Sequence, residues 1–377
     1  MMMKADSIGL YVHTPLCIKK CNYCDFCSYP ESKAEWRDSY INALCAEIDG
    51  YKEKNLSVNT VFFGGGTPSL LTPFEFEKIC SHITDSFTLD SSIEFTLEAN
   101  PKTLTKEKLN AYMSMGVNRL SIGLQSIHEN ELKILGRIHN YSEFLESYTL
   151  ARDCGIKNIN LDLMYGIPAQ SLQSFEKTLD TVLALSPEHL SLYGLILEEG
   201  TPFFELQASL DIPEEDEECD MYYLAAGKLS SAGYSHYEIS NYSKPGYECR
   251  HNLKYWHNES YVGIGVSAYS YLDGVRYGNT SEIDEYLSCE REKYIQREES
   301  AGLENEAYDY VMLGLRLSEG ISLSDYEKRF KNNFLTVERK KLIQKYSELG
   351  MIELVGDRLR LTDRGLYISN RILTDLL

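Results

Sequence analysis

The segment YVHTPLCIKKCNYCDFC, residues 11–27, holds four cysteines within eleven residues, directly after a short apolar run. They are Cys17, Cys21, Cys24 and Cys27, and the first three have the spacing C-x3-C-x2-C. Thiolates this close together can wrap one compact metal centre, and soft ligands select zinc or an iron–sulfur cluster over hard cations. Structural zinc sites usually need two separated cysteine pairs, and no second, separate pair occurs in the chain. The spacing therefore favours an iron–sulfur cluster.

Three thiolates on a four-iron cluster leave one iron without a protein ligand, and a small molecule can chelate that iron. Two alternatives stay open at this point. Cys27 could serve as a fourth ligand, or all four thiols could be plain reduced structural cysteines. The other six cysteines are scattered singly and are expected to be reduced thiols. They are Cys45, Cys80, Cys154, Cys219, Cys249 and Cys289.

Length and charge restrict the class of protein. A chain of 377 residues should divide into about two packed units. Its 37 Lys and Arg against 57 Asp and Glu give a net charge of −20, which opposes the phosphate neutralisation that nucleic-acid binding requires. No apolar stretch has the length of a membrane span, and Met1–Ser7 lacks the apolar core of a targeting signal. We expect a cytoplasmic protein that binds neither nucleic acid nor membrane.

Short β-rich runs alternate with amphipathic helical stretches from residue 8 to about residue 200. The predicted strands are Ile8–His13, Thr60–Phe63, Ile93–Glu98, Arg119–Leu124, Ile159–Met164 and Leu190–Leu195. The predicted helices are Ala34–Tyr51, Pro73–Ile83, Lys106–Met115, Tyr141–Asp153 and Leu172–Leu185. This alternation predicts right-handed βαβ units on a parallel sheet. Six strands are too few for a closed eight-unit barrel, so residues 1–200 are predicted to form an α/β domain with an open, partial (βα)6 barrel.

Two further regions follow. Residues 201–300 are predicted to form an α+β extension, in which the acidic run Pro213–Asp220 leads into a helix ending at Ser231. Aromatic, glycine-punctuated strands and loops come after it. Residues 301–377 are predicted to be helical and winged-helix-like. Their predicted elements are the helices Ala307–Leu317, Leu323–Phe330 and Val337–Leu349, a hairpin over Met351–Leu361, and a last helix from Thr362. The acidic charge argues against DNA binding by this unit, so packing or partner contact is the expected role.

In open parallel sheets, ligands collect at the carboxyl ends of the strands. The run Gly64–Gly66 follows one predicted strand, and Glu98, Gln125 and Asp162 lie at or near the ends of others. Glycines let the backbone approach a ligand and expose its N–H groups, although a plain tight turn gives the same pattern. A carboxylate such as Glu98 is costly to bury, and a bound cation would offset that cost. Together these positions favour a binding pocket.

On these residues the chain resembles the radical S-adenosylmethionine (SAM) superfamily, and Asn22-Tyr23-Cys24-Asp25-Phe26 is similar to its coproporphyrinogen-dehydrogenase-like branch. The resemblance implies that Cys17, Cys21 and Cys24 hold a [4Fe-4S] cluster whose fourth iron is chelated by SAM. It also implies a set of SAM contacts at matching positions. These are Tyr11, Tyr23, Gly65, Gly66, Thr67, Glu98, Gln125, Arg137 and Asp162.

The segment His251-Asn-Leu-Lys-Tyr255-Trp256 is similar to the H-N-x-x-Y-W motif of the HemW-type haem chaperones, as are Leu361-Thr-Asp-Arg-Gly365 and the run that starts at Asn370. This resemblance implies a protein that binds haem and passes it to an acceptor protein. His251 is then the candidate haem contact, because neutral imidazole is an axial haem ligand; a hydrogen-bonded loop histidine is the alternative. The acceptor and the cluster's electron donor are not identified by the sequence, and both a monomer and a homodimer stay open.

The competing class is an enzyme, the oxygen-independent coproporphyrinogen III dehydrogenase (oxidase) of porphyrin biosynthesis. That family uses a reduced cluster and SAM to decarboxylate propionate side chains. Its pattern places a fourth cysteine two residues after the third, whereas this chain has Asp25-Phe26-Cys27. That family also carries a sizeable segment before its cysteines, and sixteen residues precede Cys17 here. The sequence therefore favours the chaperone, a binding protein, over the enzyme.

Overall fold

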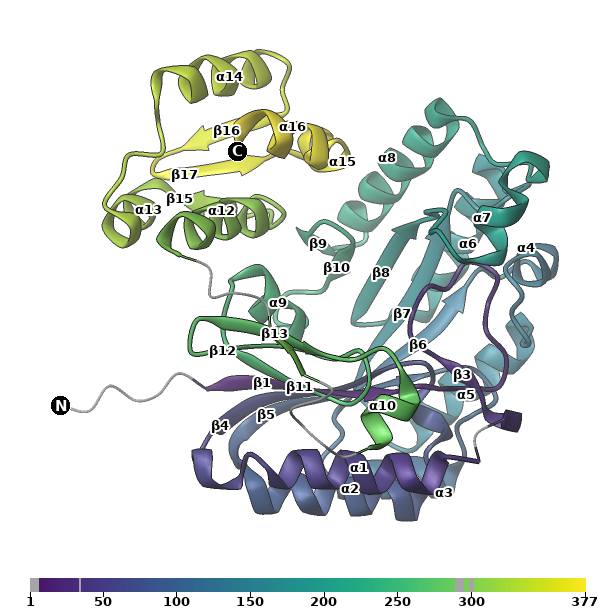
Figure 1. Cartoon of the computed structure of the whole chain (residues 1–377). Helices are drawn as coiled ribbons and strands as arrows, with labels where there is room; N and C mark the ends of the chain where they lie inside the picture. The colour runs from purple at the N-terminus through teal and green to yellow at the C-terminus, as the bar shows by residue number, and fades with distance from the viewer. Residues whose placement is uncertain (1–6, 34, 289–294, 298–301) are drawn as a thin grey trace.

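A parallel sheet runs through the first half of the computed structural model, which describes residues 7–33, 35–288, 295–297 and 302–377 (Figure 1). Its central strands pair in chain order, each parallel to the next. They are β1 (Ile8–Thr14), β4 (Ser57–Gly65), β5 (Thr88–Ala99), β6 (Arg119–Gln125), β7 (Asn158–Tyr165) and β8 (His189–Gly194). All six predicted strands are confirmed, and so is the α/β class.

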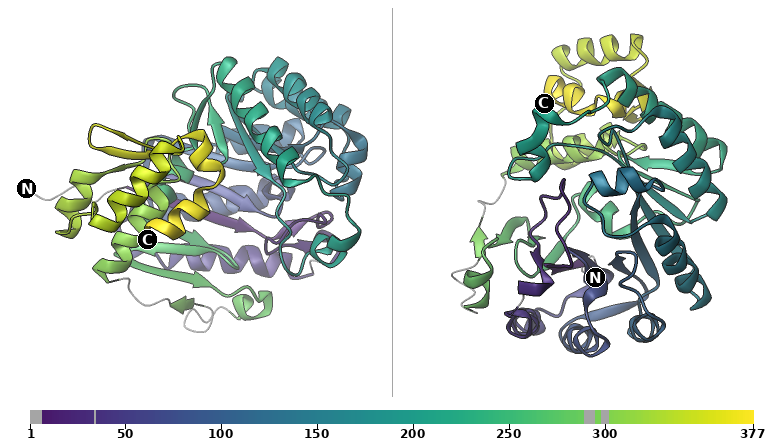
Figure 2. Two further views of the ribbon diagram at one scale, coloured as in Figure 1. Left: turned by 90° about the horizontal axis from the view of Figure 1, so that it is seen from above. Right: turned by 90° about the vertical axis from the view of Figure 1, so that its right-hand side faces the viewer.

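Helices cover the outer, convex side of this curved sheet, as Figure 2 shows. The five predicted helices are confirmed as α1 (Arg37–Asp49), α2 (Pro73–Ser86), α3 (Lys106–Ser114), α5 (Tyr141–Asp153) and α6 (Leu172–Leu185). The short α4 (Glu129–Ile134) was not predicted. Helices α2, α5 and α6 each begin with a capping box, in which Thr72, Asn140 and Ser171 exchange hydrogen bonds with the residue three positions later. Such caps are local signals, so the sequence places these helix starts well.

The described part of residues 201–300 extends the same sheet at both edges. Strand β11 (Tyr261–Ile264) pairs in parallel with β1, and β12 (Tyr269–Leu272), β13 (Val275–Asn279) and β14 (Ile295–Arg297) follow it antiparallel. At the other edge, β10 (Asn241–Ser243) and β9 (Ser235–Glu238) add to β8. The resulting sheet has twelve described strands. The predicted acidic helix is confirmed as α8 (Glu215–Ser231), with the short α7 (Pro202–Leu206) before it and α10 (Ile283–Leu287) near the other edge.

The motif that starts at His251 lies on a helix, α9 (Arg250–Trp256), where the sequence predicted strands and loops. The side chain of Glu94, from β5, caps the start of this helix. It accepts hydrogen bonds from the backbone N–H groups of Arg250 (3.1 Å) and His251 (3.0 Å). A carboxylate at a helix N-terminus satisfies unpaired donors there. Because this cap comes from a residue more than 150 positions away, no local pattern predicts the helix.

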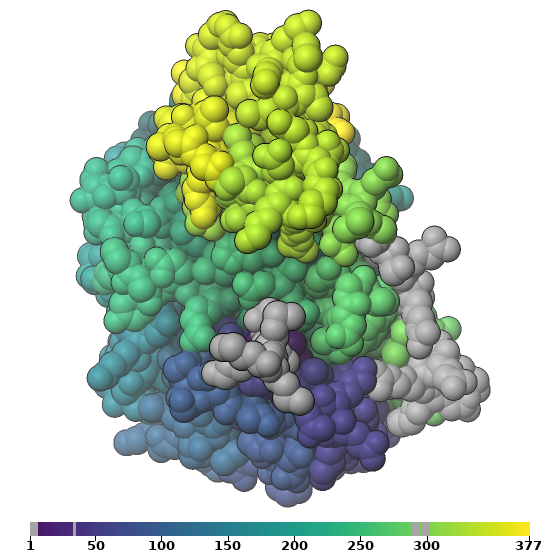
Figure 3. Space-filling view, turned by 90° about the vertical axis from the view of Figure 1, so that its left-hand side faces the viewer, coloured from purple at the N-terminus to yellow at the C-terminus, as the bar shows by residue number. Residues whose placement is uncertain are grey.

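The C-terminal unit has a hydrophobic core of its own and protrudes from the rest of the molecule (Figure 3). Its helices are α12 (Leu303–Gly314), α13 (Leu323–Phe330), α14 (Val337–Glu348), α15 (Asp363–Tyr367) and α16 (Ser369–Leu376). The predicted hairpin is present as β16 (Ile352–Val355) and β17 (Arg358–Leu361), and β15 (Ile321–Ser322) adds a third strand. The last helix, predicted from Thr362, is present as two helices, α15 and α16. This arrangement of helices and a small sheet agrees with the winged-helix-like prediction.

Among the described residues, no helix is both long enough and apolar enough to cross a bilayer. The prediction that the chain lacks a targeting signal rests on Met1–Ser7, of which Met1 to Asp6 lie outside the described residues, as does Cys289.

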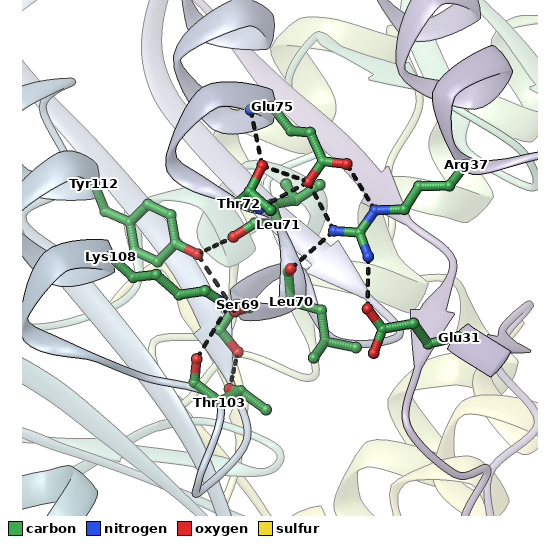
Figure 4. A network of polar contacts seen from close by, with 10 residues as sticks. All are labelled: Glu31, Arg37, Ser69, Leu70, Leu71, Thr72, Glu75, Thr103, Lys108 and Tyr112. Atoms are coloured by element: carbon green, nitrogen blue, oxygen red, sulfur yellow. Dashed lines mark hydrogen bonds and ion pairs between the residues drawn. The ribbon is translucent and has the colours of Figure 1, made fainter.

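A polar network holds the chain just after β4 against the outer helices (Figure 4). Arg37 of α1 donates from Nε and Nη2 to the two carboxylate oxygens of Glu75 of α2, both at 2.7 Å, and from Nη2 to the Leu70 carbonyl at 3.0 Å. From α3, Lys108 donates to the Ser69 carbonyl and Tyr112 to the Leu71 carbonyl, each at 2.7 Å. Three helices therefore fix the segment that follows the glycine run.

Candidate functional site

A cavity of about 450 Å³ lies at the carboxyl ends of the parallel strands. The cysteine loop, between β2 (Leu16–Cys17) and β3 (Tyr29–Pro30), forms one wall of it. Three predicted cluster ligands and eight of the nine predicted SAM contacts line this one cavity. They are Cys17, Cys21, Cys24, Tyr23, Gly65, Gly66, Thr67, Glu98, Gln125, Arg137 and Asp162. Residues from six separate parts of the chain thus meet where the sequence predicts a site.

Asn22 anchors the cysteine loop to two helices. Its backbone N–H donates to the Leu135 carbonyl and its carbonyl accepts from the Phe203 N–H, both at 3.0 Å. Its side-chain amide donates to the Ile134 carbonyl at 2.8 Å. Figure 1 shows the purple loop lying near α4 and α7. The sequence did not single out Asn22, because only its partners in space reveal this role.

Cys27 lies apart from the other three cysteines. It does not line the cluster cavity; it lines a separate hollow with His13, Tyr255 and other residues. Its Sγ is 3.6 Å from the Ser281 carbonyl, and its own carbonyl accepts a hydrogen bond from His13 Nε2 at 2.8 Å. The geometry therefore favours Cys17, Cys21 and Cys24 as the cluster ligands and disfavours a fourth thiolate.

The three remaining thiols suit a cluster by their chemistry and their setting. Burial raises the pKa of Cys17 and raises the pKa of Cys24 to about 11, so both are protonated until a metal replaces the proton. Among the described residues, no three His, Cys, Asp or Glu side chains stand close enough to hold a single metal ion. Soft thiolates around an open cavity fit a [4Fe-4S] cluster.

The glycine loop passes very close to the strand beside it. Gly65 has a φ of +106°, and a Cβ there would lie 2.5 Å from the His13 ring. A Cβ on Gly66 would lie 2.6 Å from the Leu16 carbonyl oxygen. Both positions therefore require glycine. Thr67, the next residue, accepts a hydrogen bond from the side chain of Asn100 at 2.8 Å, and its hydroxyl is 3.7 Å from Cys17 Sγ.

Glu98 has no basic partner within ion-pair distance among the residues that the structure describes. Its carboxylate accepts a hydrogen bond from the Gly65 N–H at 3.2 Å. Burial first, and then the charge of Asp162, raise the pKa of Glu98 to about 8. Asp162 has hydrogen-bond donors of its own, the Asn160 amide at 2.8 Å and the Ser121 hydroxyl at 3.2 Å. An under-compensated carboxylate on a cavity wall suits a cationic ligand.

Arg137 ties the cluster wall to the sheet. Its Nη2 donates to the Asn100 side chain at 2.5 Å and to the Gly123 carbonyl at 2.7 Å, while Nη1 points to Cys21 Sγ at 3.6 Å. Gln125 ends β6 with a φ of +69°. Backbone strain of this kind in a non-glycine residue is typical of functional sites.

A second, smaller cavity of about 210 Å³ lies beside the first and shares Gly65, Glu98 and Asp162 with it. Tyr11, the ninth predicted SAM contact, lines this inner cavity and not the larger one. The fully buried Arg119 lines it too. Its Nε has no hydrogen-bond partner, and Nη1 reaches only the Thr96 hydroxyl, at 3.5 Å. The sequence did not identify Arg119 as a site residue. In the sequence it is only the first residue of a predicted strand.

His251 also faces the inner cavity, and both of its ring nitrogens are engaged. Nδ1 is 2.9 Å from the Thr60 hydroxyl and Nε2 is 2.8 Å from the Tyr255 hydroxyl. The ring stacks on Phe62 with centroids 5.2 Å apart. Burial, followed by the charge of Lys254, lowers the pKa of His251 to about 3, so the imidazole is neutral. An iron could bind it only after displacing one of these hydroxyls, and the haem-contact prediction stays a prediction.

Comparisons with known proteins agree with this picture. The family model described as "Radical SAM superfamily" matches residues 11–182, and the model described as "HemN C-terminal domain" matches residues 303–368. The protein named heme chaperone HemW from Lactococcus lactis is 33% identical over 99% of this chain and 97% of its own length. HemW from Bacillus subtilis is 34% identical over 96% and 97%, and HemW from Escherichia coli is 36% identical over 84% and 85%.

Among solved structures, coproporphyrinogen III oxidase (HemN) from Escherichia coli superposes with a TM-score of 0.87. The match covers 98% of this chain and 90% of that one, at 22% sequence identity. At that identity the similarity establishes the fold and leaves the reaction open.

Proposed function

The chain belongs to the HemW family of haem chaperones within the radical SAM superfamily, and we propose that it binds haem and passes it to an acceptor protein. The observation that carries this proposal is sequence identity above 30% to HemW proteins over nearly the whole chain, C-terminal unit included. We propose a cytoplasmic location, in keeping with the nine described cysteines, none of which forms a disulfide. The acceptor and the electron donor belong to the proposal as classes of partner.

Within this proposal, Cys17, Cys21 and Cys24 hold a [4Fe-4S] cluster, and SAM occupies the same cavity. When bound, the cluster supplies an iron with an open coordination position and a source of single electrons. Glu98 attracts the cationic groups of SAM, because its carboxylate has no basic partner within ion-pair distance in the described chain. The Gly65–Gly66 backbone permits close approach of the ligand.

Five more residues belong to the proposed SAM site. Gln125 and Asp162 offer an amide and a carboxylate to hydroxyl or amino groups. Arg137 holds Asn100 and the cysteine loop in place and presents a positive charge to a ligand carboxylate. Tyr23 covers the cavity from the cysteine loop. Tyr11 acts indirectly, through His13. Its hydroxyl is 3.0 Å from Nδ1 of His13, and Gly65 packs against the His13 ring.

The second candidate function is that of the oxygen-independent coproporphyrinogen III dehydrogenase. We keep it as a candidate because the chain superposes on the HemN structure and matches the HemN C-terminal domain. The two functions differ in their product. A chaperone passes haem unchanged to an acceptor, whereas the enzyme decarboxylates propionate side chains and releases carbon dioxide.

One experiment separates them. The full chain is reconstituted anaerobically with iron and sulfide, and we expect about four irons per chain and uptake of one haem, followed by transfer to an apo-haemoprotein. With SAM, a reductant and coproporphyrinogen III, we expect no carbon dioxide release. Turnover of coproporphyrinogen III would overturn the chaperone assignment. The variant His251→Ala tests the predicted haem contact: weaker haem binding with unchanged iron content would support it, and unchanged haem affinity would place the haem site elsewhere in the chain.

A further inference from the structure

Five large apolar side chains are exposed around the cluster cavity. Ile196 is 68% exposed and Phe26 is 61% exposed, and the other three are between 42% and 45% exposed. All five line the cavity, and we call them the apolar rim. The apolar rim consists of Ile18, Phe26, Ile138, Tyr193 and Ile196. Apolar side chains gathered on one exposed surface around a cavity are typical of a binding site, whereas singly scattered ones are not.

The apolar rim is assembled from separate segments. Ile18 and Phe26 belong to the cysteine loop, Ile138 follows α4, and Tyr193 and Ile196 lie at the end of β8 and just beyond it. Apolar side chains from three segments that stay exposed around one cavity leave apolar surface in water, which costs free energy. A flat apolar ligand that covered the rim would remove this cost.

Positive charge borders the same cavity. Lys19 and Lys20 line it and are exposed, and within the described residues neither forms an ion pair with an acidic side chain. These two lysines carry positive charge in a chain whose net charge is −20. Arg137 is the third Lys or Arg side chain in the lining, and Asp25, Glu98, Asp162 and Glu198 also line the cavity, so the positive charge does not extend around the whole of it. The ligand that fits has an apolar face and an anionic edge.

Haem has this combination, a flat apolar ring with two propionates on one edge. The inner cavity at His251 has about 210 Å³, less than the roughly 300 to 1,000 Å³ of sites that enclose ligands of drug size. A tetrapyrrole therefore does not fit there without rearrangement, whereas the rim is open to solvent.

We propose that haem docks on the apolar rim at the mouth of the cluster cavity, with its propionates directed to Lys19 and Lys20. The inference rests on the proposed haem-chaperone function and adds the site. Haem at this position covers the cavity that holds the cluster and SAM. It leaves the C-terminal unit, none of whose described residues lines the cavity, free for another contact.

The test uses the anaerobically reconstituted full chain, titrated with haem and followed by its absorbance. Ile196→Asp and Ile138→Asp should each weaken haem binding by about ten-fold or more, because a charge replaces an apolar contact, while iron content stays unchanged. Val337→Asp is the matched control. Val337 is 66% exposed, lies on α14, and should leave haem affinity as it is.

The lysines are tested with a modified ligand. Lys19→Glu with Lys20→Glu should weaken binding of haem by about ten-fold or more, and should have little effect on haem dimethyl ester, which lacks the two carboxylates. The propionate orientation is wrong if the lysine variant binds haem as well as the unaltered chain does. It is also wrong if the lysine variant loses as much affinity for the dimethyl ester as for haem.

Three outcomes would overturn the site. If the unaltered chain binds no haem, the proposed function fails and the inference with it. If the unaltered chain binds haem and all rim variants bind equally well, the function stands and the inference fails. If the rim variants bind haem normally but lose transfer to an apo-haemoprotein, the apolar rim contacts the acceptor protein instead.

Discussion

The guanidinium of Arg137 points Nη1 to Sγ of Cys21 at a distance of 3.6 Å, although 116 residues separate the two in the chain. The other end of the same group is fixed by the Asn100 side chain and the Gly123 carbonyl. A half-buried positive charge thus lies against one predicted cluster ligand. Such a positive charge stabilises the thiolate. It also stabilises any additional negative charge on a cluster bound by that thiolate.

Arg137→Gln should therefore lower the reduction potential of the reconstituted cluster. The amide can keep one hydrogen bond of the arginine but not its charge, so the reduced cluster loses more stabilisation than the oxidised one. A potentiometric titration followed by electron paramagnetic resonance measures the shift. Arg371→Gln on α16 is the control, since that side chain is 72% exposed and paired with Asp375. An unchanged potential in Arg137→Gln would show that the guanidinium does not act on the cluster.

Cys27 and Cys21 should respond differently to substitution by serine. Cys27→Ser should keep about four irons per chain, because Cys27 lies outside the cluster cavity beside the Ser281 carbonyl. Cys21→Ser should lose the cluster, because Cys21 lines the cavity. Iron content and the visible absorbance of the cluster measure both. Equal loss in the two variants would mean four-cysteine ligation, with no open iron for SAM.

Glu98 should make SAM binding depend on pH. Burial and Asp162 raise the pKa of Glu98 to about 8, so at pH 6 to 7 the free protein carries this carboxyl mainly protonated. A cationic ligand favours the ionised form, and binding below pH 8 must release a proton. SAM affinity should therefore rise with pH up to about 8 and level off above it.

The comparison with Glu98→Gln isolates this effect, because the amino group of SAM titrates in both proteins. The variant should bind SAM about 10- to 100-fold more weakly at pH 8.5, the loss expected for a charged hydrogen bond. The difference should shrink toward pH 6. Isothermal titration calorimetry in two buffers measures affinity and proton release together. A constant difference between the two proteins across this range would contradict a titrating Glu98.

The sequence predicts most of this architecture because its signals are local. The six strands are recognisable as apolar runs, and helices such as α5 and α6 have exact expected bounds because a capping residue starts each of them. Glu98 and Asp162 could be placed at one site because the ends of parallel strands share an edge of the sheet.

What the sequence did not predict depends on contacts between distant residues. Helix α9 requires Glu94, and the pairing of β11 with β1 joins Tyr261 to Gly9. The inner position of Tyr11 and the separation of Cys27 from the other cysteines follow from how the loop folds over the sheet. The apolar rim could not be predicted from the sequence, because its side chains come from three segments. Each segment alone contributes only one or two exposed apolar residues, which is common on protein surfaces.

The ion pair between Arg37 and Glu75 should stabilise the segment that follows the glycine loop (Figure 4). Glu75 binds Arg37 through both oxygens and also accepts from the Thr72 N–H at 2.7 Å. Glu75→Ala should lower the free energy of unfolding by about 2 kcal/mol at pH 7, because it leaves a half-buried guanidinium without its main partner. Glu31→Ala is the matched control. Glu31 contacts the same Arg37 at 2.6 Å but its side chain is 41% exposed, so its loss should cost about 0.5 kcal/mol or less.

The effect of Glu75→Ala should also depend on pH in a defined direction. Burial alone would raise the pKa of Glu75, but the hydrogen bond from Arg37 and the Thr72 N–H together hold it below its usual value. A carboxyl with a lowered pKa contributes stability above its unfolded pKa of about 4.3, and that stability is lost as the pH falls through the folded pKa. The difference between the unaltered chain and Glu75→Ala in urea unfolding should therefore be constant from pH 7 to about 5 and shrink below it. A difference that grows toward acid pH would mean that Glu75 acts through packing and not through its charge, and the glycine loop would then need another support.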